Sequence, residues 1–204
     1  MTSLSASTII IPFSMKTIDL DSPTRERLMA AATALMLDRG FAATTVDDVC
    51  AKAKLTKGAF FHHFESKEDL GRVLVERWSA KRKAEHAGLF GSSPDALERV
   101  RRYADALAAG AEDGSLLKGC LLGSFSLELQ SVPAIRKACE RGFAQWVEQL
   151  GHEIALAKER HAPKAELSPS ESAEQFIALI EGAIMMAKAG GDGSVVGRVT
   201  KRFK

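Results

Sequence analysis

The sequence predicts an all-α protein, and three observations lead to that prediction. Apolar residues recur every three to four positions through most of the chain, which is the period of an amphipathic helix. Among 204 residues there are only 6 prolines and 1 tyrosine, and runs of β-branched residues are scarce. The 3 cysteines (Cys50, Cys120 and Cys139) are an odd number without a C-x-x-C spacing, which disfavours a disulfide framework.

The first element expected is a helix from Pro23 to Arg39. Ser22 is a suitable N-cap, and proline fits the first helical position, where its missing N–H is no loss. Gly40 follows as a typical residue after a helix C-terminus. The stripe that defines this helix is Leu28, Ala31, Ala32, Leu35 and Met36.

Two short helices are expected next. Thr45 caps one that begins at Val46 and ends near Lys52, and Thr56 caps the other. The connection between them is about four residues long, which is typical of a helix-turn-helix unit. Three phenylalanines, Phe60, Phe61 and Phe64, would hold the second of these helices against the first.

Longer helices are predicted over the rest of the chain. Ser66 caps the first of them, and the segment 118–130 is apolar enough to be a helix buried nearly all round. Residues 161–170 contain two prolines and read as a loop, and residues 189–204 would form at most a weak final turn. The expected ranges are 67–87, 94–109, 118–130, 133–160 and 171–188, which gives eight or nine helices in total.

These elements suggest three parts: a flexible N-terminal arm (1–21), a three-helix helix-turn-helix domain (22–74), and a C-terminal helical bundle (75–204). Met15 is an alternative start to Met1. The arm lacks the basic region and apolar core of a signal peptide, and no apolar run reaches the roughly 20 residues that span a membrane. With free cysteines, this predicts a cytoplasmic protein that does not bind membranes.

Charge is unevenly distributed. The formal net charge is only +2, from 28 basic and 26 acidic residues, but the segment 52–67 holds four lysines and one glutamate. From residue 88 onward, 15 basic residues balance 15 acidic ones. A small basic segment therefore precedes a neutral body.

The order of residues in this segment resembles the N-terminal domain of the TetR family of transcriptional regulators. The resemblance covers about residues 24–74 without an insertion. It implies a homodimeric repressor that binds a palindromic double-stranded DNA operator and is released by a small-molecule effector bound to its C-terminal helices. The motifs that carry it are Thr24-Arg25, Gly40-Phe41, Thr44-Thr45-Val46, Leu55 to Phe64 (LTKGAFFHHF) and Ser66 to Leu70 (SKEDL).

The recognition helix would present its first residues to DNA. Lys57 is the candidate for a guanine edge, Gly58 allows close approach of the backbone, and His62 reaches the groove or its phosphates. Thr45 and Lys67 stand at the first turns of the flanking helices, as phosphate clamps. The full set predicted to contact DNA is Thr24, Thr45, Lys54, Thr56, Lys57, Gly58, Ala59, Phe61, His62, His63 and Lys67.

Two positions depart from the family pattern. Lys54 stands where glycine is usual, so the turn must accept a side chain, at positive φ. Phe61 stands where tyrosine is usual, so a hydroxyl that would donate to phosphate is lost. Each DNA candidate also has a plain structural alternative, since threonines cap helices and lysines are solvated in any helical protein.

No enzyme site and no metal or cofactor site is expected. The adjacent His62 and His63 point about 100° apart on a helix, whereas zinc motifs place histidines at i and i+4. The sequence has no paired carboxylates with metal-type spacing, no phosphate-binding glycine loop and no nucleophile elbow.

In the C-terminal half, the segment from Lys118 to Phe125 resembles a subgroup with a Gly-Cys-Leu element, some of whose members sense electrophiles or oxidants through cysteine. Cys120 is therefore either a core residue or a sensor thiol whose pKa Lys118 and the helix N-terminus would lower. The alternative function is thus a thiol-based regulator, and activation instead of repression also stays open.

Two further sets of residues are predicted, each with ordinary core packing as its alternative. An effector pocket needs bulky apolar walls with a few polar groups, and a dimer interface needs an apolar helix stripe. The effector set is Trp78, Tyr103, Cys120, Phe125, Phe143, Trp146 and Met185. The dimer set is Phe176, Leu179, Ile180, Ala183 and Ile184.

Overall fold

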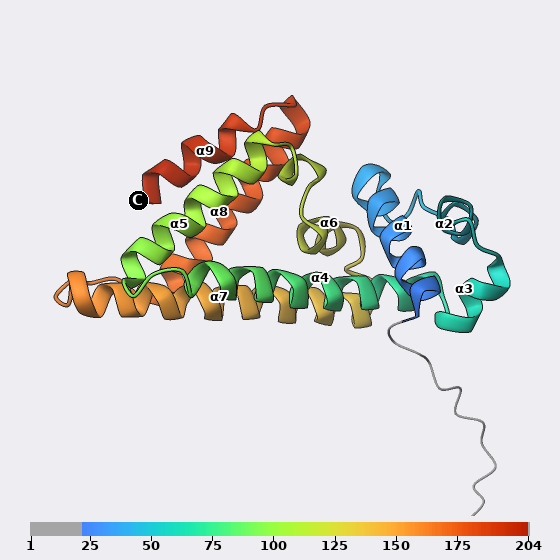
Figure 1. Cartoon of the computed structure of the whole chain (residues 1–204), viewed down its shortest axis with the longest axis horizontal. Helices are drawn as coiled ribbons and strands as arrows, with labels where there is room; N and C mark the ends of the chain where they lie inside the picture. Colours follow the sequence, from blue (N-terminus) through green and yellow to red (C-terminus); the bar gives the residue numbers. More distant parts are fainter. Residues whose placement is uncertain (1–21, 204) are drawn as a thin grey trace, which may run out of the picture.

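The computed structural model describes residues 22–203, so the predicted N-terminal arm lies outside the described residues. The described chain is all-α, as predicted, and Figure 1 shows the arrangement of its helices. Two short 3-10 helices, Leu116–Lys118 and Lys201–Phe203, accompany them. The α-helices are α1 (Pro23–Arg39), α2 (Val46–Ala53), α3 (Lys57–His63), α4 (Lys67–Phe90), α5 (Ala96–Glu112), α6 (Leu121–Glu128), α7 (Pro133–His161), α8 (Pro169–Gly190) and α9 (Ser194–Thr200).

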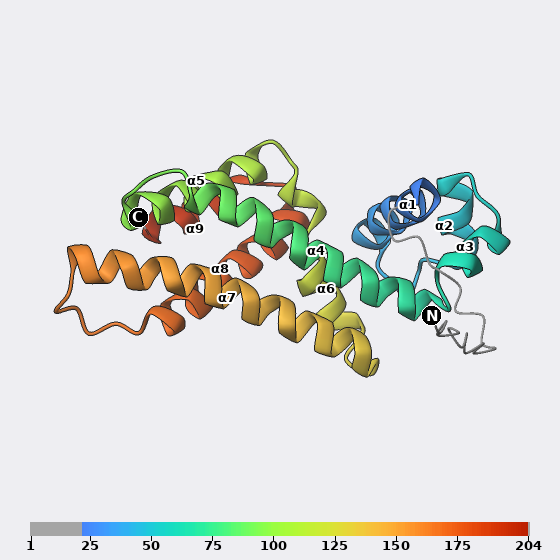
Figure 2. The same ribbon diagram turned by 60° about the horizontal axis from the view of Figure 1, so that its bottom comes forward.

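The molecule is elongated, with a small head at one end. Helices α1 to α3 form this head beside the N-terminal end of α4, while α5, α8 and α9 gather near the other end (Figure 1). The two longest helices, α4 and α7, run side by side between these regions in both views (Figures 1 and 2). The long helices α4 and α7 therefore connect the head to the rest of the molecule.

Local sequence explains the turns of the head. Helix α1 ends where the Gly40 N–H donates to the Met36 carbonyl at a φ of 90°, a conformation that favours glycine. Helix α2 begins with a capping box in which Thr45 and Asp48 satisfy each other's backbone N–H groups. Helix α3 begins with the Thr56 side chain accepting a hydrogen bond from the Ala59 N–H. These caps fix where α2 and α3 begin.

Two apolar clusters hold the fold together. One includes residues of α1 to α4, Leu121, Leu122 and Phe125 of α6, and Ile135, Ala138 and Cys139 of α7. The Phe41 and Phe125 rings meet edge to face at 5.5 Å within it. The other cluster joins α5, α7, α8 and α9 around Tyr103 and Phe176. The core of the head is thus continuous with the α6–α7 region.

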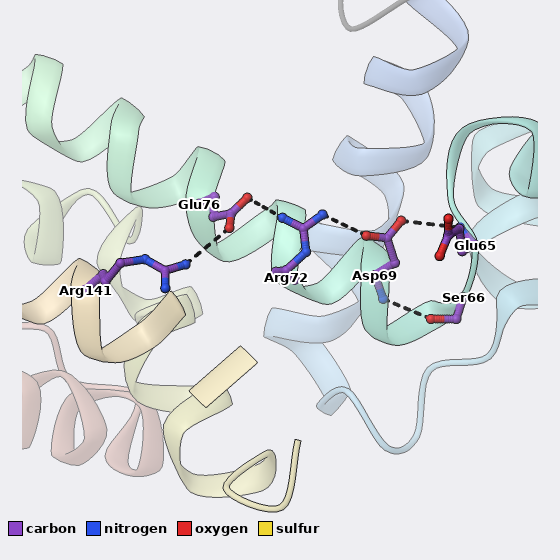
Figure 3. A network of polar contacts seen from close by, with 6 residues as sticks. All are labelled: Glu65, Ser66, Asp69, Arg72, Glu76 and Arg141. Atoms are coloured by element: carbon purple, nitrogen blue, oxygen red, sulfur yellow. Dashed lines mark hydrogen bonds and ion pairs between the residues drawn. The ribbon is translucent and has the colours of Figure 1, made fainter. Parts of the chain in front are cut away.

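A polar network runs along the outside of the first half of α4 (Figure 3). Arg72 bridges Asp69 and Glu76 on its own helix, at 2.8 and 2.7 Å, and Glu76 also pairs with Arg141 of α7 at 3.4 Å. Asp69 accepts a longer hydrogen bond from the Glu65 N–H, while its own N–H donates to Ser66. The network links the turn before α4 to α7.

Several predicted boundaries were wrong. Helix α4 extends one turn further than expected, and α5 starts at Ala96 because Asp95, and not Pro94, provides the cap for the N–H groups of Leu97 and Glu98. Helix α8 starts at Pro169 under a Ser168 cap, inside the predicted loop. The weak final turn is in fact the helix α9.

The segment predicted as one helix buried nearly all round is interrupted. Lys118 belongs to a 3-10 turn, Gly119 has a φ of 96°, and α6 covers only 8 residues. Its Leu127 side chain is 67% exposed, so α6 buries only one side. None of the described helices combines the length and apolar character needed to cross a membrane.

Candidate DNA-reading surface and central cavity

The N-terminal ends of α2 and α3 share an exposed surface. Of the residues predicted to contact DNA, Thr24 and Ala59 are partly exposed. Seven are exposed: Thr45, Lys54, Thr56, Lys57, Gly58, Phe61 and His62. We call these seven residues the reading surface.

The turn between α2 and α3 is held in the expected unusual conformation. Lys54 has φ 54° and ψ 50°, in the left-handed region, and its N–H donates to carbonyls at the end of α2. The Arg27 guanidinium of α1 donates to the Ala53 carbonyl at 2.6 Å and reaches that of Lys54 at 3.3 Å. Arg27 was not among the predicted residues, since an arginine on a helix gives no sign that it will cap another helix.

Lys57 and Gly58 lie at the start of α3. The Lys57 ammonium pairs with the Asp47 carboxylate at 2.8 Å, and this partner raises the lysine pKa, so the side chain is charged. Both side chains are about two-thirds exposed, hence the pair is weak and Lys57 can exchange Asp47 for a DNA group. A Cβ on Gly58 would contact only the Thr56 hydroxyl, so folding does not require glycine at this position. The space beside the Gly58 Cα is open, and the residue is exposed.

Phe61 and His62 extend the same surface. Phe61 is 53% exposed and touches Phe60 edge to face, which fixes its ring on the outside of α3. Its ring can contact sugar or a thymine methyl group but donates no hydrogen bond. His62 is exposed beside it.

The structure contradicts two of the predicted DNA contacts. His63 is only 8% exposed and packs inward near Phe64, so it cannot reach a groove. Lys67 turns toward its own chain, donates to the Phe41 and Thr44 carbonyls at 3.1 and 3.0 Å, and lies 4.3 Å from the centre of the Phe41 ring. The prediction for His63 came from its position after Gly58 and that for Lys67 from a helix start, but His63 is buried and Lys67 is engaged by its own chain.

The body contains a second candidate site, a cavity enclosed by α4, α5, α6, α7 and α8. We call it the central cavity; it is partly open to solvent. Its walls are mostly apolar, with a few polar groups, as expected of a small-molecule site. It is lined by Trp78, Ser79, Arg82, Lys83, His86, Leu107, Leu116, Gly119, Cys120, Leu122, Gly142, Gln145, Trp146, Gln149, Glu181 and Ile184.

One wall of the cavity holds a chain of hydrogen bonds. The Trp146 indole N–H donates to the Tyr103 hydroxyl at 2.6 Å, and that hydroxyl lies 3.4 Å from His86 Nε2. The indole is only a donor, so the Tyr103 hydroxyl accepts from it, and the same hydroxyl donates to His86 Nε2 or accepts from it according to the imidazole tautomer. Burial, reinforced by the nearby Arg82 charge, lowers the His86 pKa to about 4, so this imidazole is neutral at pH 7.

The opposite wall holds Glu181 and Cys120. The Cys120 thiol donates a hydrogen bond to the Glu181 carboxyl, and the absence of a side chain on Gly123 leaves room for that carboxyl. Burial and the Glu181 charge raise the Cys120 pKa, despite the Gly123 and Leu122 N–H groups at the start of α6. Lys118 does not line this cavity. Of the two readings of Cys120, the structure therefore favours the core cysteine over a thiol whose pKa is lowered by Lys118 and the helix N-terminus.

The structure separates the predicted effector residues. Trp78, Cys120 and Trp146 line the central cavity. Tyr103 lies behind its wall, and Phe143 stacks on Trp146 at 6.4 Å without lining it. Phe125 is a core residue beside Phe41, and Met185 is 56% exposed outside the cavity. His86 and Glu181 were not among the predicted residues, because a polar residue in a helical pattern gives no indication of burial.

Most of the residues predicted for the dimer interface lie on the side of α8 that packs against the rest of the same chain. Phe176, Ile180, Ala183 and Ile184 are all buried inside the single chain, so they are not free to contact a second copy. Leu179 is 49% exposed. The outer side of the helix also carries Gly182, with open space around it, and the exposed Met185 and Met186.

Helix α6 connects the cavity to the head. Its N-terminal residues Cys120 and Leu122 line the cavity, and at its other end the Glu128 carboxylate accepts a hydrogen bond from the Ala42 N–H at 3.0 Å. A second link comes from α8, where the Lys188 ammonium donates to the Leu37 carbonyl at 2.7 Å. The first link ends in the segment that joins α1 to α2, and the second ends in the last turn of α1.

Comparison with known proteins gives the same picture over most of the described chain. Residues 28–72 match the family described as bacterial regulatory proteins, tetR family. Residues 96–203 match the domain described as tetracyclin repressor-like, C-terminal domain. The first match covers the head, and the second covers the body from the start of α5.

Curated proteins and solved structures are similar over most of the length. The HTH-type transcriptional repressor DhaR of Mycobacterium sp. (strain GP1) is 34% identical over 169 residues, which are 82% of this chain and 83% of that protein. The HTH-type transcriptional repressor NemR of Escherichia coli (strain K12) is 28% identical over 167 residues, covering 81% and 84%.

Among solved structures, the reduced form of E. coli NemR has a TM-score of 0.76 at 25% identity and covers 89% of this chain and 95% of that one. The regulatory protein TetR from Rhodobacter sphaeroides has a TM-score of 0.81 at 25% identity, covering 89% and 97%. With a helix-turn-helix head, a helical body and these matches, the chain belongs to the TetR family of bacterial regulatory proteins.

Proposed function

We propose that this protein is a DNA-binding transcriptional repressor that acts in the cytoplasm as a homodimer and leaves its operator when a small molecule occupies the central cavity. Relatives of similar length carry the name transcriptional repressor, among them DhaR and NemR. The observation that carries the proposal is the reading surface, where exposed side chains and two capped helix starts face outward together.

The reading surface suits a DNA groove for a physical reason. The N-terminus of α3 presents backbone N–H groups to phosphate, Gly58 removes the side chain that would prevent close approach, and Lys57 supplies a donor for base edges. Lys54 and Thr45 add phosphate partners on either side. The surface combines positioning contacts with at least one base-reading group.

Effector response would pass through α6. A molecule that fills the cavity presses on Cys120 and Leu122, and the same short helix holds the α1–α2 connection through Glu128. Displacement of α6 therefore changes the tilt of the head relative to α4. In a dimer this changes the distance between two recognition helices.

Dimerisation would use the outer side of α8, around Leu179, Gly182 and Met186. These three positions follow an i, i+3, i+7 spacing, and small residues allow two helices to approach closely. Leu179→Glu should shift the protein toward monomer in analytical ultracentrifugation. The matched change Leu156→Glu, on an exposed leucine of α7, should not.

The function is tested by selecting DNA. Purified protein is mixed with fragments of the genome that encodes it, and bound fragments are sequenced. We expect one palindromic sequence to be enriched, and the genes beside it then indicate effectors to assay. Equal recovery of all fragments at moderate salt would refute the proposal.

The role of Lys57 is tested on the selected operator. Lys57→Ala should weaken operator binding by about 1–3 kcal/mol and relax the preference at one base position of each half-site. Lys52→Ala removes an exposed lysine of α2 outside the reading surface and serves as the matched control. Full affinity and unchanged preference in the Lys57 variant would remove Lys57 from the base contacts.

A further inference from the structure

The junction between the head and the body contains a second hollow, which we call the joint crevice. Its volume is about 360 Å³, within the range of sites that hold small molecules, and it is partly open to solvent. Residues of α1 and α2 in the head, and of the 3-10 turn Leu116–Lys118 and α8 in the body, line it together and share none of their number with the central cavity. The lining residues are Ala34, Leu35, Leu37, Asp38, Lys52, Leu117, Lys118 and Lys188.

Three lysines that are far apart in sequence converge on the joint crevice. Lys52 belongs to the last turn of α2, Lys118 to the 3-10 turn and Lys188 to α8. Among the lysines of residues 22–203, ion pairs with carboxylates are formed by Lys57 and Lys81 and not by these three. Asp38 is the acidic residue in the lining, so three positive charges against one negative leave the crevice with a formal charge of +2.

The ammonium group of Lys188 is already held in place by the surrounding chain. It donates to the Leu37 carbonyl of α1 at 2.7 Å and lies 3.4 Å from the Lys118 carbonyl. An ammonium group has three N–H donors, so one remains for a ligand, and the residue is exposed. Because its side chain is already positioned, Lys188 loses less conformational freedom on binding an anion than an untethered surface lysine would.

The rest of the lining is apolar. Leu37 is only 5% exposed, and Leu35 and Leu117 are half-buried. Each CH₂ group that a ligand buries against such a surface strengthens binding by up to about fourfold. A molecule that joins an anionic group to a short apolar body would therefore use both parts of the lining.

We propose that the joint crevice is a second ligand site, which binds a small phosphate monoester with a short apolar body. A phosphate monoester carries about 1.5 to 2 negative charges at pH 7, which matches the formal charge of the crevice. The phosphate group lies among Lys52, Lys118 and Lys188, and the apolar body lies against Leu35 and Leu117. The inference goes beyond the proposed function, because it does not depend on repression or on the occupant of the central cavity.

Other ligand classes match the joint crevice less well. A cation would be repelled by three ammonium groups and could pair only with Asp38. A neutral molecule would contact the leucines but leave the remaining Lys188 donor to water. The phosphate backbone of DNA is another anion that lysines bind, but Lys118 and Lys188 belong to the body and not to the head that carries the reading surface.

Calorimetric titration with hexyl phosphate tests the ligand class. We expect a Kd of about 0.1–1 mM, as a ligand of this size allows. Inorganic phosphate lacks the apolar body, hexanol lacks the charge, and hexylammonium reverses it, so each should bind at least about tenfold more weakly. Hexanoate, with a single charge, should also bind more weakly than hexyl phosphate. Binding of hexanol or hexylammonium as tight as that of hexyl phosphate, or no binding of hexyl phosphate, would overturn the proposal.

Tryptophan fluorescence shows which cavity the ligand occupies. The chain has 2 tryptophans, and both line the central cavity while neither lines the joint crevice. Hexyl phosphate should therefore bind in the calorimeter and leave the tryptophan emission unchanged. Quenching of that emission with the calorimetric Kd would place the ligand in the central cavity and contradict the proposal.

Variants test the lysines themselves. The double variant Lys52→Ala/Lys118→Ala removes two exposed side chains that pair with no carboxylate of residues 22–203, so it should fold, and it should weaken hexyl phosphate binding by at least about tenfold. The matched control Lys137→Ala/Lys164→Ala removes two exposed lysines elsewhere and should leave the Kd unchanged. Because Lys188→Met also breaks the link to Leu37, the double variant is the decisive one. An unchanged Kd in the double variant would remove the site.

Operator binding separates this site from a DNA contact. Fluorescence anisotropy of labelled operator should give the same affinity for the double variant as for the unmodified protein. Loss of hexyl phosphate binding with intact operator affinity supports the ligand site. Loss of operator affinity with intact hexyl phosphate binding would show that these lysines contact DNA, and the ligand site would be wrong while the DNA-binding function stands.

Discussion

Two carbonyl oxygens in the connection between α1 and α2, those of Phe41 and Thr44, accept hydrogen bonds from the single ammonium group of Lys67. Lys67→Met keeps the aliphatic stem and removes both charge-assisted bonds. We expect it to lower the free energy of unfolding by about 2 kcal/mol in urea titrations. The slope of log K against log salt for operator binding should stay unchanged, because Lys67 touches no phosphate. A shallower slope with unchanged stability would restore Lys67 as a phosphate clamp.

The neutral His86 makes folding stability depend on pH. Its pKa is lowered from 6.5 to about 4 in the folded protein, so between these values the unfolded chain binds the proton first. Stability is therefore highest above pH 6.5 and falls as the pH drops toward 4, by about 3 kcal/mol for this group. Urea titrations at pH 7 and pH 5 measure the effect.

His86→Phe is the companion variant. It retains an aromatic ring among Phe90, Tyr103 and Trp146, which surround the imidazole. Its loss of stability between pH 7 and pH 5 should be smaller than that of the unmodified protein. An identical loss in both proteins would show that other groups cause the acid sensitivity.

At the scale of elements, the left-handed turn at Lys54 is a point of strain. A non-glycine residue in this region costs about 1 kcal/mol, and the structure holds it there through Arg27. Lys54→Gly should therefore raise the free energy of unfolding by up to about 1 kcal/mol in thermal or urea denaturation. A loss of stability would show that the Lys54 side chain contributes more than its backbone strain costs.

The elements that local chemistry defines were predictable from sequence. Ser22-Pro23 and Gly40 correctly gave both ends of α1, and Thr45, Thr56 and Ser66 gave the starts of α2, α3 and α4. The start of α5 failed because two adjacent residues could begin the helix, and only the Asp95 side chain bonds decide between them. The apolar segment 118–130 failed because hydrophobicity does not reveal a break at Gly119.

Sites were harder to predict than elements. The reading surface follows from positions at helix starts, yet whether a lysine such as Lys67 faces outward depends on partners far away in sequence. On α8 the 3.6-residue period correctly grouped Phe176, Ile180 and Ile184, but periodicity cannot distinguish a face buried in one chain from a face between two. The buried pair His86 and Glu181 has no local signature at all.

At the scale of the whole molecule, charge divides the protein into unequal parts. The near-neutral total of +2 hides an excess of positive charge between residues 52 and 67. A dimer that neutralises roughly eight phosphates should show a slope of log K against log salt near −7. Filter binding or anisotropy between low and moderate salt measures it, and a slope near zero would exclude a binding mode based on phosphate contacts.

The continuous core also limits how this protein can be taken apart. At Gly71 of α4, an added Cβ would lie 2.9 Å from the Phe41 ring and 3.0 Å from Ile135. The head, α4 and α7 therefore meet without space for one extra carbon. Cutting the chain after α4 would uncover the apolar surface that Leu121, Leu122 and Phe125 now cover. The DNA-reading head thus cannot be transferred to another protein by itself. A chimaeric regulator that uses this head must also include α6 and the first turns of α7.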